Sequence, residues 1–203
     1  MYQLIQKWYA RAMARTREFD LDQALDRAMD LFWRRGYAAT SLQDLLTELS
    51  IGSGSLYAAF GSKDKLYARA LERYCSQYAG GLIELLQNAD EIRPVVRAAL
   101  TQMVEADLED PERGCLLVNA ATERGDDPGT VDRVAITMRL LESSLAAALE
   151  KAKARGELPA DKEPVALARF LTTFVQGLRV VGRARLGRAF VEDAVDTALR
   201  SLD

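Results

Sequence analysis

The sequence predicts an all-α protein with a short three-helix unit near its N-terminus and a longer helical domain after it. Apolar residues recur at spacings of three and four along nearly the whole chain, and the alternation typical of strands is absent. Hydrophobic residues make up 49% of the 203 residues, enough for a substantial core, and charged residues make up 28%, enough for a soluble surface. We found no internal repeat and no low-complexity segment.

Helix start and stop signals divide the chain into about nine helices. Asp20 is a good N-cap for the first helix and Gly36 ends it, while Thr40 with Gln43 three residues later resembles a capping box. Ser62 can cap a long helix that Gly80-Gly81 would kink or break. The expected helices are 21–35, 41–49, 53–60, 63–88, 92–109, 111–124, 128–155, 162–183 and 187–202.

The two short helices at residues 40–60 are the most informative segment. Helices of about eight residues are unstable alone, so these two must share a core with the preceding helix. Leu56 and Phe60 lie four residues apart and therefore on one face. The other face then shows only small groups to solvent, namely Ser53, Gly54, Ser55 and Ala58. Such a slim helix fits the major groove of DNA, and its amino end offers free N–H groups to phosphates.

The run Leu56-Tyr57-Ala58-Ala59-Phe60-Gly61-Ser62-Lys63, preceded by a threonine, a short helix and a turn, resembles the TetR family of transcriptional regulators. The resemblance implies a helix-turn-helix DNA-binding domain at 13–67 and an effector-binding and dimerisation domain at 68–203. In the family, the residues that match Thr40, Tyr57 and Lys63 contact phosphates. Those nearer the base edges match Gln43, Ser53, Gly54 and Ser55, and the residues before the first helix add cations, here Arg15 and Arg17.

Two positions depart from the family pattern. Ser50 stands where the turn usually has glycine, and a left-handed conformation there costs a serine about 1 kcal/mol. Leu46 stands where a small alanine is more usual. We therefore expect the crossing of the two short helices to be slightly opened.

The net charge of −3 looks unfavourable for DNA binding, but the charges are unevenly distributed. Residues 1–19 contain four cations (Lys7, Arg11, Arg15 and Arg17) against Glu18, which gives 4 − 1 = +3. This end either faces phosphates or is simply a solvated tail. Residues 1–12 precede Met13, a natural starting residue, so they are either a packed extension or a consequence of the choice of start site.

The second domain carries two further predictions from the resemblance. The family dimerises through its last two long helices, here 162–183 and 187–202, and an apolar stripe that includes Phe170 and Leu178 suits either a dimer interface or the protomer's own core. The middle helices enclose an effector pocket. Its candidate lining residues, each also typical of an ordinary core, are Leu82, Leu86, Met103, Leu117, Met138, Leu141 and Phe174.

Cys75 and Cys115 form no CxxC pair and are expected to be free thiols. Cys115 lies near a predicted helix start beside Arg113, in a segment that resembles a subset of TetR-like regulators. Both features lower the pKa of a thiol and favour the reactive thiolate. A redox or electrophile sensor at Cys115 is therefore one interpretation, and a buried small apolar residue is the other.

The absence of histidine excludes Ser-His-Asp and Cys-His catalytic sites and histidine-based metal sites. Gly61-Ser-Lys63 is no phosphate loop, because that motif needs adjacent Gly and Lys after a strand. We therefore expect no enzyme, no cofactor and no metal; a helical enzyme or scaffold is the alternative.

Without a secretory signal or an uninterrupted apolar span, the expected location is the cytoplasm, with no membrane partner. The expected partners are a double-stranded DNA operator, a second copy of the chain and a small effector. The many Leu, Met and Phe residues favour an apolar effector. The predicted function is a repressor released from a palindromic operator by that effector, with activation left open.

Overall fold

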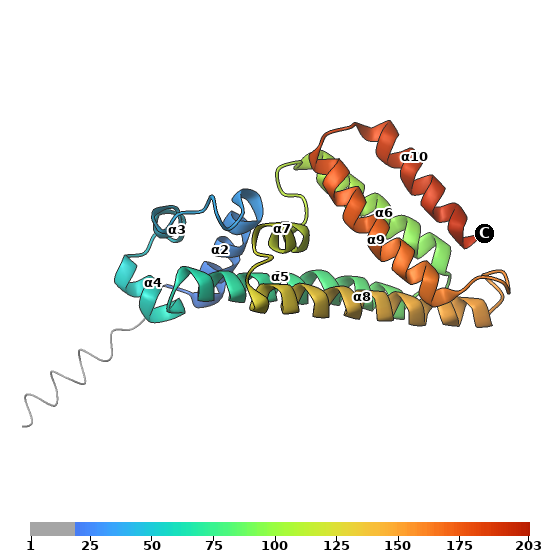
Figure 1. Ribbon diagram of the computed structural model, residues 1–203, viewed down its shortest axis with the longest axis horizontal. Coiled ribbons are helices and arrows are strands. Elements are labelled where there is room, and N and C mark those ends of the chain that lie inside the picture. The colour runs from blue at the N-terminus through green and yellow to red at the C-terminus, as the bar shows by residue number, and fades with distance from the viewer. Residues whose placement is uncertain (1–18) are drawn as a thin grey trace, which may run out of the picture.

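The computed structural model describes residues 19–203, which form nine α-helices, one short 3-10 helix and no strand. The all-α prediction is confirmed, and Figure 1 shows an elongated arrangement with α3 and α4 at one end and the chain terminus at the other. The helices are α2 (Leu21–Arg35), α3 (Leu42–Leu49), α4 (Ser53–Phe60), α5 (Lys63–Gln87), α6 (Ile92–Glu109), α7 (Leu116–Glu123), α8 (Pro128–Ala154), α9 (Pro164–Arg183), α10 (Arg188–Leu199) and η1 (Arg200–Leu202).

The helices α2, α3 and α4 form a unit that we call the head. The head closes around a core in which Phe32, Leu45 and Leu56 are completely buried. Leu56 and Phe60 share the buried face of α4, as the spacing predicted. Asp20 caps α2, since one carboxylate oxygen accepts the N–H of Asp22 at 2.8 Å. These local signals place α2 and α4 where the sequence expected them.

The N-cap of α3 is Ser41, one residue later than predicted. Its hydroxyl accepts the N–H of Asp44 at 3.1 Å, and the Asp44 carboxylate accepts the N–H of Ser41 at 2.8 Å. The predicted pairing of Thr40 with Gln43 is therefore wrong. Thr40 is fully buried and its hydroxyl donates to the Gly36 carbonyl at 2.7 Å, so it is unable to act as the cap. Ser50 adopts the expected left-handed conformation, with φ 56°.

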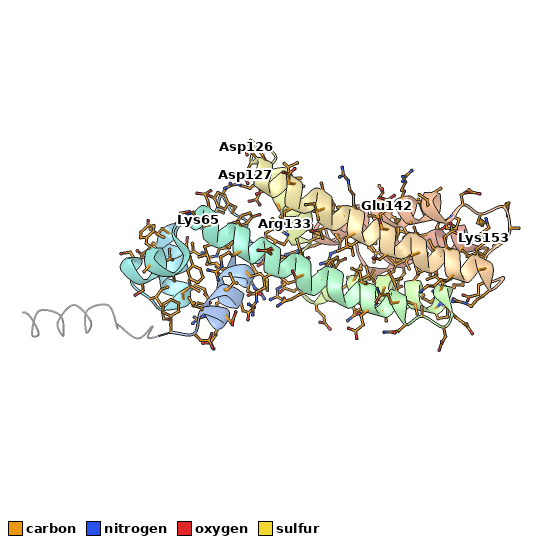
Figure 2. All side chains as sticks on the ribbon, turned by 90° about the horizontal axis from the view of Figure 1, so that it is seen from below. Lys65, Asp126, Asp127, Arg133, Glu142 and Lys153 are labelled. Carbon is orange, nitrogen blue, oxygen red and sulfur yellow. The ribbon has the colours of Figure 1, made fainter. Side chains whose placement is uncertain are left out.

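The helices α6 to α10 form the second unit, the body, and α5 belongs to both units. α5 continues without a break through Gly80 and Gly81, so the helix does not end there as the sequence allowed. Figure 2 shows α8 lying along α5, and the labelled Arg133 of α8 pairs with Glu72 of α5 at 3.0 Å. The body core is made by side chains of α6, α8, α9 and α10, among them Leu149 and Leu199. The predicted boundary at residue 67 thus lies inside one continuous helix.

Two helices of the body begin later than predicted. α7 begins at Leu116, because Gly114 has φ 57° and Cys115 is extended, which prevents a helix from running through from residue 111. α9 begins at Pro164 after an extended Glu163, where the prediction had Asp161 as the cap. A residue before proline avoids the helical region, so the helix starts at the proline itself. α10 ends at Leu199 and the chain finishes in a 3-10 turn.

Candidate nucleic-acid interface and effector pocket

The outer face of α4 is exposed at the tip of the head. Ser53, Gly54, Ser55 and Ala58 all lie in solvent, and the Tyr57 side chain is 49% exposed. Gly52 precedes the helix and offers no side-chain cap, so the N–H groups of the first turn face outward. Gln43 is also exposed, on α3. The head therefore presents a narrow helix with small and hydrogen-bonding groups, a shape that fits a major groove.

Two of the predicted phosphate contacts have partners inside the protein. The ammonium of Lys63 donates to the Tyr37 carbonyl at 2.8 Å and lies 4.1 Å from the centroid of the Tyr37 ring. Partial burial lowers the pKa of Lys63. Thr40 is buried, as described above. Arg15 and Arg17 lie outside the described residues, and their contacts with phosphate stay predictions like those of Thr40, Tyr57 and Lys63.

The sequence motif singles out Lys63 but passes over Lys65, two residues further into α5. Lys65 is exposed, is labelled in Figure 2 at the head end of α5, and has no ion pair within residues 19–203. Its only signal in the sequence is the spacing Lys-Asp-Lys at the start of a helix. Lys65 is therefore a second cation at the head end of α5 and a matched partner for testing Lys63.

A Lys63→Ala variant should bind all DNA sequences more weakly, because one phosphate contact is removed. The slope of log K against the logarithm of the salt concentration should become shallower by about 1. Fluorescence anisotropy with a specific and a random duplex over a range of salt concentrations measures both quantities. Lys65→Ala, which leaves the Tyr37 carbonyl contact intact, separates loss of a cation from loss of that hydrogen bond. Unchanged affinity of Lys63→Ala at low salt would show that Lys63 has only a structural role.

Hydrogen bonds and an ion pair at the end of α7 connect the body to the head. The Glu123 carboxylate accepts the N–H of Tyr37 at 2.7 Å, and Arg124 pairs with Asp64 at 2.9 Å. The Tyr37 hydroxyl donates to Asp64 at 2.6 Å, and the Arg124 guanidinium lies 4.0 Å from the Tyr37 ring centroid. Hydrogen bonds from Tyr37 and Arg124 lower the pKa of Asp64. We call Tyr37, Asp64, Glu123 and Arg124 the α7 clamp; nothing local in the sequence indicates it.

An interior cavity of about 50 Å³ lies between α5, α6, α8 and α9. Of the predicted pocket residues, Leu82, Leu86, Met103 and Leu141 line it. The other three do not: Leu117 is fully buried in the core around the head, Met138 packs against that same core, and Phe174 packs on the body core and stacks on Phe170. Polar lining residues that the sequence analysis missed are Tyr78, Thr172 and Gln176.

Cys115 is buried at the N-cap position of α7, and Cys75 is also a buried free thiol. The hydroxyl of Tyr74 lies 3.7 Å from the Cys115 sulfur. Arg113, which the sequence suggested as an activating cation, instead pairs with Asp30 and lies 4.6 Å from the Trp33 ring centroid. The charge of Arg113 is thus already paired on α2.

Comparisons with known proteins agree on one family. The model described as "Bacterial regulatory proteins, tetR family" matches residues 24–70, and the model "Tetracyclin repressor-like, C-terminal domain" matches residues 89–200. The chain is 33% identical to the uncharacterized HTH-type transcriptional regulator YezE of Bacillus subtilis, over 94% of this chain and 100% of that protein. It is 31% identical to the HTH-type transcriptional repressor ComR of Escherichia coli, over 94% and 92%.

The solved structures give the same answer. The TetR family transcriptional regulator CifR, as a cysteine mutant complexed with 26-bp double-strand operator DNA, superposes with a TM-score of 0.83 at 34% identity, covering 94% of this chain and 100% of that chain. The reduced form of Escherichia coli NemR has a TM-score of 0.78 at 24% identity, covering 88% and 94%, and shows the shared fold. Members of this family are DNA-binding regulators rather than enzymes. The chain therefore belongs to the TetR family of DNA-binding transcriptional regulators.

Proposed function

We propose that the protein is a cytoplasmic homodimeric repressor that binds a palindromic operator through α4 and is released by a small, mainly apolar effector. The observation that carries the proposal is the exposed outer face of α4, where Ser53, Gly54 and Ser55 stand free at the tip of the head. The printed descriptions of two relatives support it, since ComR is a repressor and CifR was solved on operator DNA.

An exposed apolar face on α8 and α9 supports dimerisation. Ile136 and Leu140 of α8 and Phe170 and Val180 of α9 are each 45–58% exposed. α9 is apolar enough, by length and composition, to cross a membrane. The structure explains this composition, because α9 buries Leu171 and other residues on one face and presents apolar residues on another as well.

The interface that we propose uses α8 and α9, whereas the sequence analysis expected residues 162–183 and 187–202. Beyond Phe190, which lies near its start and is 52% exposed, α10 packs its apolar face on the body core through residues such as Val191 and Val195, and its outward positions include Glu192, Asp193 and Asp196. We therefore propose that α8 and α9 of each protomer form the four-helix bundle, with α10 outside it. Such a dimer would hold two copies of α4 for half-sites about 34–36 Å apart.

The link between effector and operator is α5. This helix starts at Lys63 in the head and carries Leu82 and Leu86 to the interior cavity. A cavity of about 50 Å³ holds no more than a few waters, whereas drug-sized ligands occupy roughly 300–1,000 Å³. An effector that entered this cavity would have to move the surrounding helices, and a movement of α5 changes the position of the head. The affinity of the protein for the effector and its affinity for the operator would therefore be linked.

The test combines dimerisation with DNA binding. Phe170→Asp should convert the dimer into a monomer in sedimentation velocity and weaken operator binding by at least about 100-fold, because only one half-site is then read at a time. Leu108→Asp, an exposed apolar position on α6, is the matched control and should change neither quantity. A reporter placed behind the operator should be repressed by the wild-type protein. A monomeric wild type that still binds tightly would refute the dimer model.

A thiol-based sensor is a second candidate, favoured by the position of Cys115. Its sulfur lies 4.0 Å from the Gln176 side-chain oxygen, and Gln176 lines the interior cavity. A small electrophile that enters the cavity would therefore arrive beside the thiol. The neighbour CifR was solved as cysteine mutants and the neighbour NemR in its reduced form.

Alkylation with iodoacetamide, in which the thiolate displaces iodide and forms a thioether, tests this candidate. If Cys115 is the sensor, alkylation should release the operator from wild-type protein and from Cys75→Ser, but leave Cys115→Ser bound. Mass spectrometry of the intact protein gives the labelled fraction. A Cys115 thiol that stays unlabelled in the folded protein would end this alternative. The same would follow if Cys115 were labelled without loss of operator binding.

A further inference from the structure

We propose that effector recognition takes place in a second pocket, at the joint between head and body, and that it accepts an uncharged planar aromatic ligand carrying an acceptor oxygen. This inference rests on the proposed effector-controlled repression. The pocket has a volume of about 310 Å³, at the lower end of the range for small-molecule sites. Its lining comes from α2, α5, α6 and α9 and includes Trp33, Tyr74, Tyr78, Met103 and Arg179. We call it the joint pocket.

The walls of the joint pocket favour a flat ring. The rings of Tyr74 and Tyr78 stack with their centroids 5.7 Å apart and their planes within 5° of parallel, and Trp33 meets Tyr74 edge-on at 4.8 Å. A planar ligand can extend this aromatic array with favourable stacked or edge-to-face geometry. Space is available beside Gly81, where an added Cβ would meet no atom within 4 Å. The site therefore has the shape for one or two fused rings.

The joint pocket also has more hydrogen-bond donors than good acceptors. The Tyr78 hydroxyl donates to the Met103 sulfur at 3.7 Å, and the Tyr74 hydroxyl donates to the Cys115 sulfur at 3.7 Å. The Nε of Arg179, a buried side chain, has no acceptor within residues 19–203. Sulfur is a weak acceptor, and buried donors normally have strong ones. Burial raises the pKa of both tyrosines, so they remain donors. A ligand oxygen would supply the missing acceptor.

The charge of Arg179 is already balanced. Its guanidinium pairs with the buried Asp107 at 2.8 Å and also donates to the carbonyls of Met103 and Gly114. An anionic ligand would add an unbalanced negative charge to this low-dielectric region, which is costly. An uncharged carbonyl oxygen avoids that cost while accepting a hydrogen bond. The structure thus favours an aromatic ketone, amide or ester over an aromatic acid.

Trp33 gives the joint pocket a direct connection to the head. It belongs to α2, and its indole N–H donates to the Gly114 carbonyl at 3.0 Å, the same carbonyl that accepts from Arg179 of α9. A movement of the head therefore moves one wall of the pocket. The lining of the interior cavity includes no residue of α2, α3 or α4. The affinity of a ligand for the joint pocket would consequently differ between one position of the head and another. Such a difference is the requirement for coupling ligand binding to operator binding.

The experiment compares two ligands of nearly the same shape, 2-acetylnaphthalene and 2-ethylnaphthalene, of which only the ketone has an acceptor oxygen. Calorimetry without DNA should show the ketone binding about tenfold more tightly, the size of effect expected for one hydrogen bond to an otherwise poorly paired donor. Tyr74→Phe, at a residue that lines the joint pocket but not the interior cavity, should remove most of that advantage and leave hydrocarbon binding unchanged. Thr172→Val, in the interior cavity, is the matched control and should change neither affinity.

Operator release is measured separately, by anisotropy with labelled duplex. The ketone should lower operator affinity of the wild type, and Trp33→Leu should weaken both ligand binding and release. Equal affinity for the two ligands, or sensitivity to Thr172→Val in place of Tyr74→Phe, would overturn the joint pocket as the site. Ketone binding that depends on Tyr74 but leaves operator affinity unchanged would overturn the coupling. Failure of the wild type to bind any operator would instead refute the proposed function, since the calorimetry involves no DNA.

Discussion

A Ser55→Asp variant should lose at least about 100-fold in operator affinity while melting at or slightly above the temperature of the wild type. Ser55 is exposed and is the third residue of α4. A carboxylate in the first turn of a helix is favourable for the helix itself, so folding is preserved. Against DNA phosphates the same charge is repelled, and like charges brought together at an interface cost several kcal/mol, where 2.7 kcal/mol is about 100-fold.

The matched control for this variant is Ser76→Asp, the same exchange at an exposed position of α5 away from α4. Anisotropy with operator duplex and thermal unfolding by circular dichroism measure the two quantities. Operator binding by Ser55→Asp within a few-fold of the Ser76→Asp value would show that α4 is not the DNA-reading helix. A large loss of melting temperature in Ser55→Asp would instead indicate an error in the helix assignment.

Arg179→Met should lower the free energy of unfolding by about 3–5 kcal/mol, because it leaves the Asp107 carboxylate buried without its partner. Both side chains of this ion pair are only 6% exposed. The change also removes the donor to the carbonyls of Met103 and Gly114. Urea unfolding at pH 7 measures the loss. Arg169→Met is the control: Arg169 pairs with Glu142 at 2.7 Å but is 71% exposed, so its removal should cost less than about 1 kcal/mol.

The destabilisation by Arg179→Met should shrink as the pH falls. Burial already raises the pKa of Asp107, and loss of the guanidinium raises it further. A group whose pKa is higher in the folded than in the unfolded protein binds its proton preferentially in the folded state. Its favourable contribution is therefore present at low pH and is lost as the pH rises through the folded pKa. A difference between variant and wild type that is equally large at pH 5 and pH 7 would contradict this account.

Much of the fold was predictable because capping signals act over a few residues. Asp20, Gly36 and Asp127 each end or begin a helix where the sequence placed them, since their side chains or φ angles satisfy nearby backbone groups. The choice between Thr40 and Ser41 as the cap of α3 was different. It depends on whether Thr40 is drawn into the core, and packing with distant segments decides that.

The candidate site was predictable where one helix carries it and not where distant segments meet. The outer residues of α4 follow from the period of a single helix. The α7 clamp joins Tyr37 to Glu123, and the joint pocket brings Trp33 beside Gly114, so both depend on contacts between residues more than 80 positions apart. Likewise, an apolar pattern indicates that Leu117 and Phe174 are buried but does not indicate which neighbours they pack against. The pattern therefore did not show that both residues lie outside the interior cavity.

The α7 clamp has a consequence for how such a regulator diversifies. Glu123 and Arg124 reach the chain at Tyr37 and Asp64, on either side of residues 41–61, and within the described residues none of their hydrogen bonds or ion pairs enters that segment. Residues 41–61 are themselves held by the head core and by ion pairs to α2, Arg27–Glu48 and Arg35–Asp44. The α7 clamp holds the chain outside this segment, so substitutions at its exposed outer positions can accumulate without disturbing the clamp. If these positions read DNA, as we propose, operator preference can change while the attachment of the head to the body stays the same.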